Sequence, residues 1–210
     1  YKSADGKWLY PEEVKKAPDG SAVDVASNRP VTIGRREVMS KSKKNVVAPA
    51  AIIDSYGADT ARLFMLSDSP PERDLEWTES GVDGAWRYIN RLWRLVDEAK
   101  VALPQSDTAR PAQLSPTADA LIRAAHKTIH AVSESLDLFR FNVAVAQVRT
   151  LTNQIEEVDG KGPGEPWVVR QAVEALVRLV GPMIPHIAEE MWAALGHKTL
   201  LCREAWPKAD

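Results

Sequence analysis

Cysteine is almost absent from this sequence, since Cys202 is the single one in 210 residues. One cysteine excludes an internal disulfide and leaves no partner thiols for a structural zinc site. It also has no evident partner for nucleophilic catalysis, so we expect an unreactive thiol. A protein of a reducing compartment, the cytoplasm, fits this composition.

Long apolar runs are also missing. No stretch approaches the roughly 18 residues that a membrane-spanning helix needs, and no charged-then-apolar start indicates a secretory signal. We therefore expect a soluble protein that has no membrane partner. An excess of one charge is missing too: 27 Lys and Arg face 29 Asp and Glu, for a formal net charge of −2. Any affinity for a polyanion must come from local clusters of basic residues.

The sequence does have enough apolar residues to build a core, at 44% of the chain. This length suits one domain, or one domain with a smaller appendage. The first residue is Tyr1 rather than methionine, so we expect the chain to be part of something larger.

Residues 1–37 are rich in turn formers. Two Asp-Gly pairs separate short extended candidates at residues 7–10 and 31–33. This pattern predicts hairpins or irregular β structure. After Pro49 the pattern changes to that of helices.

Two short helices are predicted at residues 50–56 and 59–66, broken at Gly57, with Asp59 as the N-cap of the second. The strongest helix is predicted to begin near Ser80, because its apolar residues recur at spacings of three and four. These residues are Val82, Ala85, Trp86, Ile89, Leu92, Trp93 and Val96. We expect both tryptophans to pack in the core rather than to stack on bases.

Three further helical stretches follow a proline-containing linker, and a last helix is predicted to begin at Pro185 and to end at Gly196. In chain order, the three stretches are marked by Leu121, Ala125, Ile129, Val132 and Leu136; by Ala144, Val148, Leu151 and Ile155; and by Val169, Val173, Leu176, Val177 and Val180. The fold class is therefore mainly α: an antiparallel helix bundle preceded by a small irregular β-containing segment.

The segment at residues 38–45 reads V-M-S-K-S-K-K-N. Its three ammonium groups and two hydroxyls could stabilise negative charge on the phosphates of a nucleotide, which needs positioned cations more than covalent chemistry. The alternative is a solvated lysine-rich loop, because basic clusters alone are weak evidence.

The pentapeptide resembles the KMSKS loop of class I aminoacyl-tRNA synthetases, and the resemblance continues after it. N-V-V at residues 45–47 and Y-G-A-D-T-A-R at residues 56–62 follow in the order that this family shows. Residues 69–77 and the aromatic and arginine-rich helix after them are similar to leucyl-tRNA synthetases in particular. P-H-I-A-E-E-M-W at residues 185–192 is similar to the last helix of the family's anticodon-binding bundle.

The resemblance implies that Lys41 is the catalytic lysine of the loop. The family's first loop lysine is Val38 here, so the phosphate contact is expected of Lys41. The residues expected to bind the ATP phosphates are Ser40, Lys41, Ser42, Lys43 and Lys44. ATP with Mg²⁺ is the implied cofactor of the full-length enzyme, with none tightly bound to this fragment.

For the full-length parent, the resemblance implies a leucine–tRNA ligase that activates leucine with ATP and transfers it to tRNA(Leu). The implied parts are a β-containing segment at residues 1–37, the loop and a helical connector at residues 38–78, and an anticodon-binding-type bundle at residues 79–210. This chain contains neither an H-I-G-H run nor the alternating strand and helix text of a nucleotide-binding domain. We therefore expect the fragment alone to be inactive, leucine to bind outside it, and the protein to be a monomer.

The candidate tRNA-binding residues are Arg87, Arg91, Arg94 and Trp77. The three arginines share the side of the helix opposite its apolar face and could neutralise phosphates; the competing interpretation is a solvent face of ion pairs. Trp77 could support the loop or contact tRNA. Base-specific reading by the bundle is not expected, because leucyl enzymes commonly make little use of the anticodon.

No metal site is expected. His186 with Glu189 and Glu190 does not have the H-E-x-x-H spacing, and His126 and His130 have no third ligand in sequence. Two alternatives to a leucine-specific enzyme stay open: a sister synthetase for isoleucine, valine or methionine, or a non-catalytic helical RNA-binding module. The sequence of residues 69–77 favours the leucine enzyme over these sister enzymes.

Overall fold

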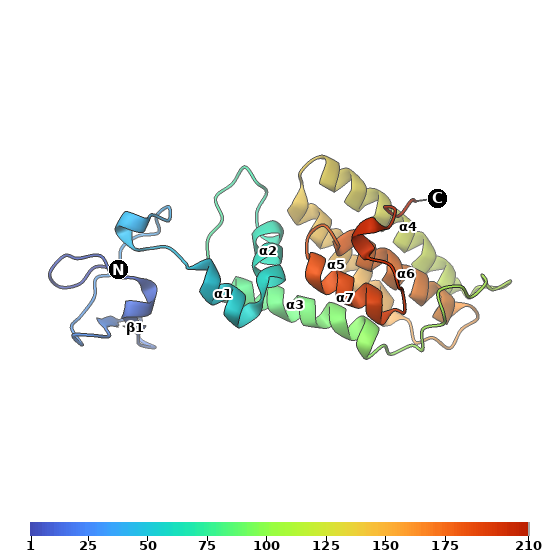
Figure 1. The fold of residues 1–210 in the computed structure, drawn as a ribbon, viewed down its shortest axis with the longest axis horizontal. Coiled ribbons are helices and arrows are strands. Elements are labelled where there is room, and N and C mark those ends of the chain that lie inside the picture. Colours follow the sequence, from blue (N-terminus) through green and yellow to red (C-terminus); the bar gives the residue numbers. More distant parts are fainter. Residues whose placement is uncertain (210) are drawn as a thin grey trace. The chain divides into compact units, whose positions relative to one another are not determined.

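The computed structural model describes residues 1–209 (Figure 1). The chain forms two compact units, Tyr1–Ser55 and Tyr56–Asp210, which we call the loop unit and the helical unit. The boundary between the units lies within the predicted connector at residues 38–78. The second helix of that connector packs against the bundle and so belongs to the helical unit. The mainly α fold class that the sequence predicts is confirmed.

The loop unit has little regular structure. Its elements are the 3₁₀ turn η1 (Pro11–Glu13), the strands β1 (Val14–Lys16) and β2 (Ala22–Asp24), and the 3₁₀ turn η2 (Lys41–Lys43). The two strands are antiparallel, and Gly20 adopts a φ of +84° in the turn between them, a conformation that glycine adopts without strain. The extended candidates at residues 7–10 and 31–33 form single bridges to Lys2 instead of strands.

The helical unit contains most of the helices. The α-helices of the described chain are α1 (Pro49–Tyr56), which crosses the boundary, α2 (Ala58–Ser67), α3 (Glu79–Asp97), α4 (Pro116–Asp137), α5 (Phe141–Glu157), α6 (Glu165–Val180) and α7 (Pro185–Ala194), followed by the 3₁₀ turn η3 (Leu201–Arg203). α4 packs against α5 and α6, and α6 packs against α7 (Figure 1). No helix within residues 1–209 is long and apolar enough to cross a membrane.

The core of the helical unit is mainly apolar. Leu151, Leu179, Ile184 and Trp192 are at most 1% exposed. α7 begins at Pro185 as predicted, and the chain reverses at Gly196, whose φ is +91°. Both signals are local, since proline suits the first turn of a helix and glycine suits its end.

Asp59 does not cap α2, so that prediction is wrong. Gly57 is the N-cap residue of α2, whereas the carboxylate of Asp59 accepts hydrogen bonds from the backbone N–H of Ile187 at 2.8 Å and contacts Nδ1 of His186 at 2.9 Å. The first turn of any helix has unsatisfied N–H groups. Asp59 satisfies one in α7, a partner distant in sequence.

The prediction that Trp86 packs in the core is also wrong, because its side chain is 42% exposed. The buried residues of α3 are Val82, Ala85, Tyr88 and Leu92. The buried face is rotated toward Tyr88, whose hydroxyl lies 2.9 Å from Oγ1 of Thr152 on α5. Burial raises the pKa of Tyr88 to about 12. The buried face thus includes a polar contact to α5.

Candidate functional site

The lysine-rich segment folds into a tight turn. The N–H of Lys43 donates to the carbonyl of Ser40 at 3.1 Å, and the N–H of Lys44 donates to the carbonyl of Lys41 at 3.2 Å. Lys44 then adopts a left-handed φ of +51°, which reverses the chain. The hydroxyls of Ser40 and Ser42 lie 2.8 Å apart. Lys41 therefore stands at the start of a short, ordered turn.

Asn45 closes this turn through its side chain. Its Oδ1 accepts from the N–H of Ser40 at 2.7 Å, and its Nδ2 donates to the carbonyl of Val38 at 3.2 Å. The sequence reasoning assigned no role to Asn45. Asparagine is the residue type whose side chain imitates a peptide group, so its place directly after a basic turn is the signal that could have identified it.

Two of the three loop lysines are paired. Lys43 forms an ion pair with Glu37, which also accepts from Nε of Arg35 at 3.3 Å. These cations hold the pKa of Glu37 below its usual value, with the hydrogen bond from Lys43 the largest cause. Lys44 lies 3.5 Å from the carboxylate of Glu13, with its ammonium 4.6 Å from the centre of the Tyr10 ring.

Lys41 differs from both. Its side chain is exposed, and within residues 1–209 it forms no ion pair, hydrogen bond or ring contact through its ammonium group. Val38, at the first position of the motif, is 81% exposed and contributes its backbone carbonyl to the Asn45 contact. The loop thus offers one unneutralised cation, together with two hydroxyls, to an anion.

The three candidate arginines of α3 have different surroundings. Arg91 donates from Nε to Glu156 at 2.8 Å and from Nη2 to Asn153 at 2.7 Å, both on α5. The Arg91 hydrogen bond lowers the pKa of Glu156. Arg87 lies 3.6 Å from Asp83 and is mostly exposed. Arg94 is exposed. A tRNA contact by each of them stays a prediction, and Arg91 is already engaged in holding α3 to α5.

Trp77 packs against the buried ring of Phe64. Their ring centres are 5.1 Å apart and the planes are inclined by 76°, an edge-to-face arrangement. Phe64 is 2% exposed, and a Cβ at Gly81 would lie 2.5 Å from its ring. Glycine at that position lets the start of α3 approach α2 closely. Trp77 therefore supports the α2–α3 contact, and its contact with tRNA stays a prediction.

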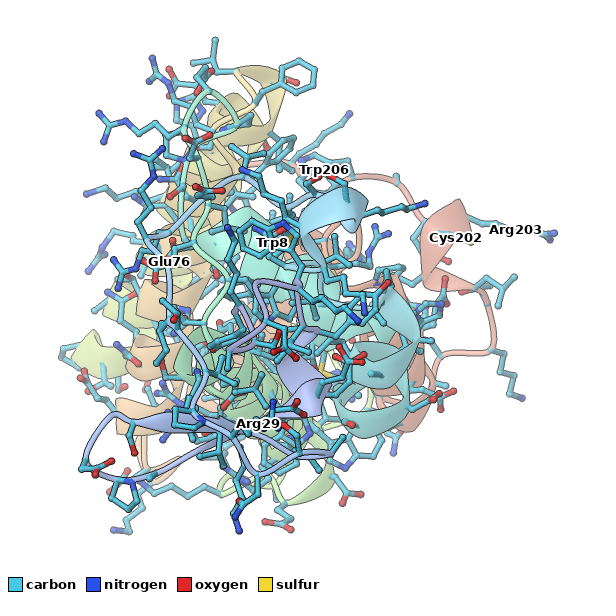
Figure 2. The ribbon with its side chains drawn as sticks, turned by 90° about the vertical axis from the view of Figure 1, so that its left-hand side faces the viewer. Trp8, Arg29, Glu76, Cys202, Arg203 and Trp206 are labelled. Carbon is cyan, nitrogen blue, oxygen red and sulfur yellow. The ribbon has the colours of Figure 1, made fainter. Side chains whose placement is uncertain are left out.

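The polar residues around α7 serve structural contacts. His186 bonds to Asp59, and Glu189 accepts from the backbone N–H groups of Leu201 and Cys202 at 2.7 and 2.9 Å. Cys202 and Arg203 point outward from η3 (Figure 2). Glu189 raises the pKa of the Cys202 thiol, which disfavours the nucleophilic thiolate. The described part of the chain holds no group of three or more metal-ligating side chains.

A shallow recess of about 410 Å³ lies on the helical unit between α2, α3 and α7. Trp86, Asn90, His186 and Glu190 are among its lining residues, and no lysine or arginine lines it. Asp59 and Glu190 give it carboxylates. The recess therefore does not suit a phosphate, unlike the turn at Lys41.

Two family models match this chain. Residues 119–210 match the anticodon-binding domain of tRNA ligase, and residues 31–78 match the class I tRNA synthetases for isoleucine, leucine, methionine and valine. The apo methionyl-tRNA synthetase of Mycobacterium tuberculosis has the same fold at a TM-score of 0.53 and 15% identity, over 70% of this chain and 34% of that one. These two segments are thus similar to the class I tRNA synthetases in sequence.

Its relatives define the member of that class. The leucine–tRNA ligases of Paramagnetospirillum magneticum and Rhodospirillum rubrum are 59% and 52% identical over all of this chain, which spans 24% of each of them. The leucyl-tRNA synthetase of Agrobacterium radiobacter K84, solved with tRNA and LeuAMS, matches 82% of this chain and 22% of its own at a TM-score of 0.73 and 28% identity. The chain belongs to the leucyl-tRNA synthetase family, as its sequence predicts.

Proposed function

We propose that the whole protein containing this chain is a leucine–tRNA ligase. It joins the carboxylate of leucine to the α-phosphorus of ATP and releases pyrophosphate, and it then transfers the leucyl group from this adenylate to a hydroxyl of tRNA(Leu) and releases AMP. The proposal is supported by the leucine–tRNA ligases that match the full length of this chain. In this proposal the residues that contact leucine lie outside this segment. The whole protein is proposed to be a monomer in the cytoplasm.

In this proposal the loop unit serves the activation step. Negative charge moves onto the pyrophosphate as its bond to the α-phosphorus breaks, and a positioned cation stabilises that charge. The observation that carries the role is the exposed, unpaired ammonium of Lys41, which precedes two lysines that are already paired with carboxylates. The other residues of the turn shape it and contact the same ATP phosphates: Ser40, Ser42, Lys43 and Lys44. Mg²⁺ prefers oxygen ligands, which this cationic turn offers poorly, so the metal would be held by ATP and by residues elsewhere.

The helical unit serves tRNA in the same proposal. Arg87 and Arg94 are exposed on α3 and could neutralise phosphates of the tRNA body. Arg91 keeps α3 against α5 through Glu156 and so acts by holding the other two in place. No base-specific contact is assigned to the bundle.

Lys41→Ala in the full-length parent tests the loop's role. We expect leucine-dependent ATP–pyrophosphate exchange to fall about 100-fold, the usual loss for one charge-stabilising donor. Lys15→Ala, an exposed lysine on β1, is the matched control and should exchange at the parental rate. A parental rate for Lys41→Ala would show that the assigned role is wrong.

A further inference from the structure

We propose that Asn45 is a positioning residue that sets the orientation of Lys41. The inference rests on the proposed function of the loop. Its basis is the pair of hydrogen bonds from one side chain to both sides of Met39, at Val38 and Ser40. Asn45 itself does not contact the reacting atoms in this proposal.

The two bonds constrain the strand that enters the turn. Backbone groups of Val38 and Ser40 point to the same side of an extended segment, and the amide of Asn45 supplies one acceptor and one donor to that side. The 2.7 Å bond to the N–H of Ser40 fixes the residue directly before Lys41. Because Ser40 is the N-cap residue of η2, its orientation determines where the turn begins.

The turn has few other contacts that could replace this one. Within residues 1–55, Ala22 is the one buried residue, so no apolar core holds residues 38–45. Lys43 and Lys44 are attached to Glu37 and Glu13 by partly exposed ion pairs, and such pairs hold geometry weakly. The side chain of Asn45 is the contact that ties the backbone of both Val38 and Ser40, at the entry of the turn, to its exit.

The side-chain chemistry at position 45 is specific. An aspartate keeps an oxygen for the N–H of Ser40 and loses the donor to Val38, whereas an alanine loses both. A displacement of about 1 Å of a catalytic group can cost about 100-fold in rate. Removing the contact should therefore slow the chemical step while leaving leucine binding, which lies outside this segment, unchanged.

The experiment uses the full-length parent with Asn45→Ala, Asn45→Asp, Lys41→Ala and the Asn45→Ala/Lys41→Ala double variant. We expect Asn45→Ala to lower kcat of ATP–pyrophosphate exchange at least 10-fold with an unchanged KM for leucine, and Asn45→Asp to lower it less. The double variant should be no slower than Lys41→Ala, because a residue that acts through Lys41 has no effect once Lys41 is gone. Asn90→Ala, which removes an asparagine contact within α3, is the matched control.

Hydrogen exchange gives a second readout that does not depend on activity. The Ser40 amide should exchange faster in Asn45→Ala than in the parent and stay protected in Asn45→Asp. An unchanged Ser40 amide, a parental rate for Asn45→Ala, or a double variant slowed by the full product of both single effects would each overturn the positioning role. A parental rate for Lys41→Ala would instead overturn the proposed function of the loop, and the role of Asn45 with it.

Discussion

The loop unit and the helical unit are each stabilised by a different kind of interaction. In the loop unit Ala22 is the single buried residue among residues 1–55, and hydrogen bonds and exposed ion pairs define its turns. In the helical unit whole side chains such as Leu151 and Ile184 are fully buried. Each buried side chain of that size stabilises the fold by about 1.5–3 kcal/mol.

The two units are therefore sensitive to different substitutions. In a unit without a core, one lost polar contact changes the local geometry and hardly changes global stability, because little else depends on it. In a packed bundle the reverse holds, since surface contacts are dispensable and a missing methyl group leaves a cavity. Under the proposed function, the first arrangement suits the loop that contacts ATP, and the second suits the bundle that contacts tRNA.

The largest expected effect is on the core of the helical unit. Leu151→Ala should lower the free energy of unfolding by about 2–5 kcal/mol, because Leu151 is 0% exposed and the site cannot collapse fully. Urea unfolding of the chain, followed by far-UV circular dichroism, measures this change. Val25→Ala in the loop unit, where the side chain is 63% exposed, is the control and should stay within about 0.5 kcal/mol. Equal losses of stability in the two variants would show that the two units do not differ in this way.

A smaller effect separates the two units by function. Replacing both Arg87 and Arg94 with alanine in the full-length parent should weaken tRNA binding about 10-fold and reduce the salt dependence of binding by about one to two phosphate contacts. ATP–pyrophosphate exchange should not change. Filter binding at several salt concentrations measures the first effect. Arg203→Ala removes one exposed arginine from η3 (Figure 2) and serves as the control for the loss of a single charge. Unchanged binding by the double variant would refute the assignment.

The smallest effect concerns the ion pair between Arg91 and Glu156. The pKa of Glu156 is lowered in the folded state, so the pair stabilises the fold above the ordinary value of 4.5, and this contribution is lost as the pH falls below it. Glu156→Gln should cost about 0.5 kcal/mol near pH 7, as for other part-exposed pairs, and almost nothing at strongly acidic pH. Thermal unfolding across this range, with Glu157→Gln as the matched variant, checks it. A difference that does not vary with pH would contradict the assigned pair.

Much of the helical unit could be predicted because its signals are local. The spacing of apolar residues located α3 to α6, and Pro185 and Gly196 located the last helix, which ends at Ala194. The hairpin was harder to locate. Its turn carries an Asp-Gly pair, but each strand has only three residues, too few to show an alternating pattern.

The predictions that are wrong concern residues whose contacts are distant in sequence. Trp86 has the spacing of a core residue, yet α3 buries the side that carries Tyr88, which contacts Thr152 on α5. Asp59 has the position of a local cap and bonds to Ile187 instead. Helical periodicity places a residue on a face of its helix and does not say which face another helix will cover.

By itself, the sequence determined the helices, the basic turn and the membership of the leucyl-tRNA synthetase family, because each depends on residues close together in the chain. Which basic side chains stay free to bind an anion could be learned only from the tertiary structure. Arg91 is engaged by Glu156, Lys43 and Lys44 are engaged by Glu37 and Glu13, and Lys41 is left unpaired. The reason is physical: a charge is neutralised by whatever lies within a few ångströms, and the folded chain sets those neighbours.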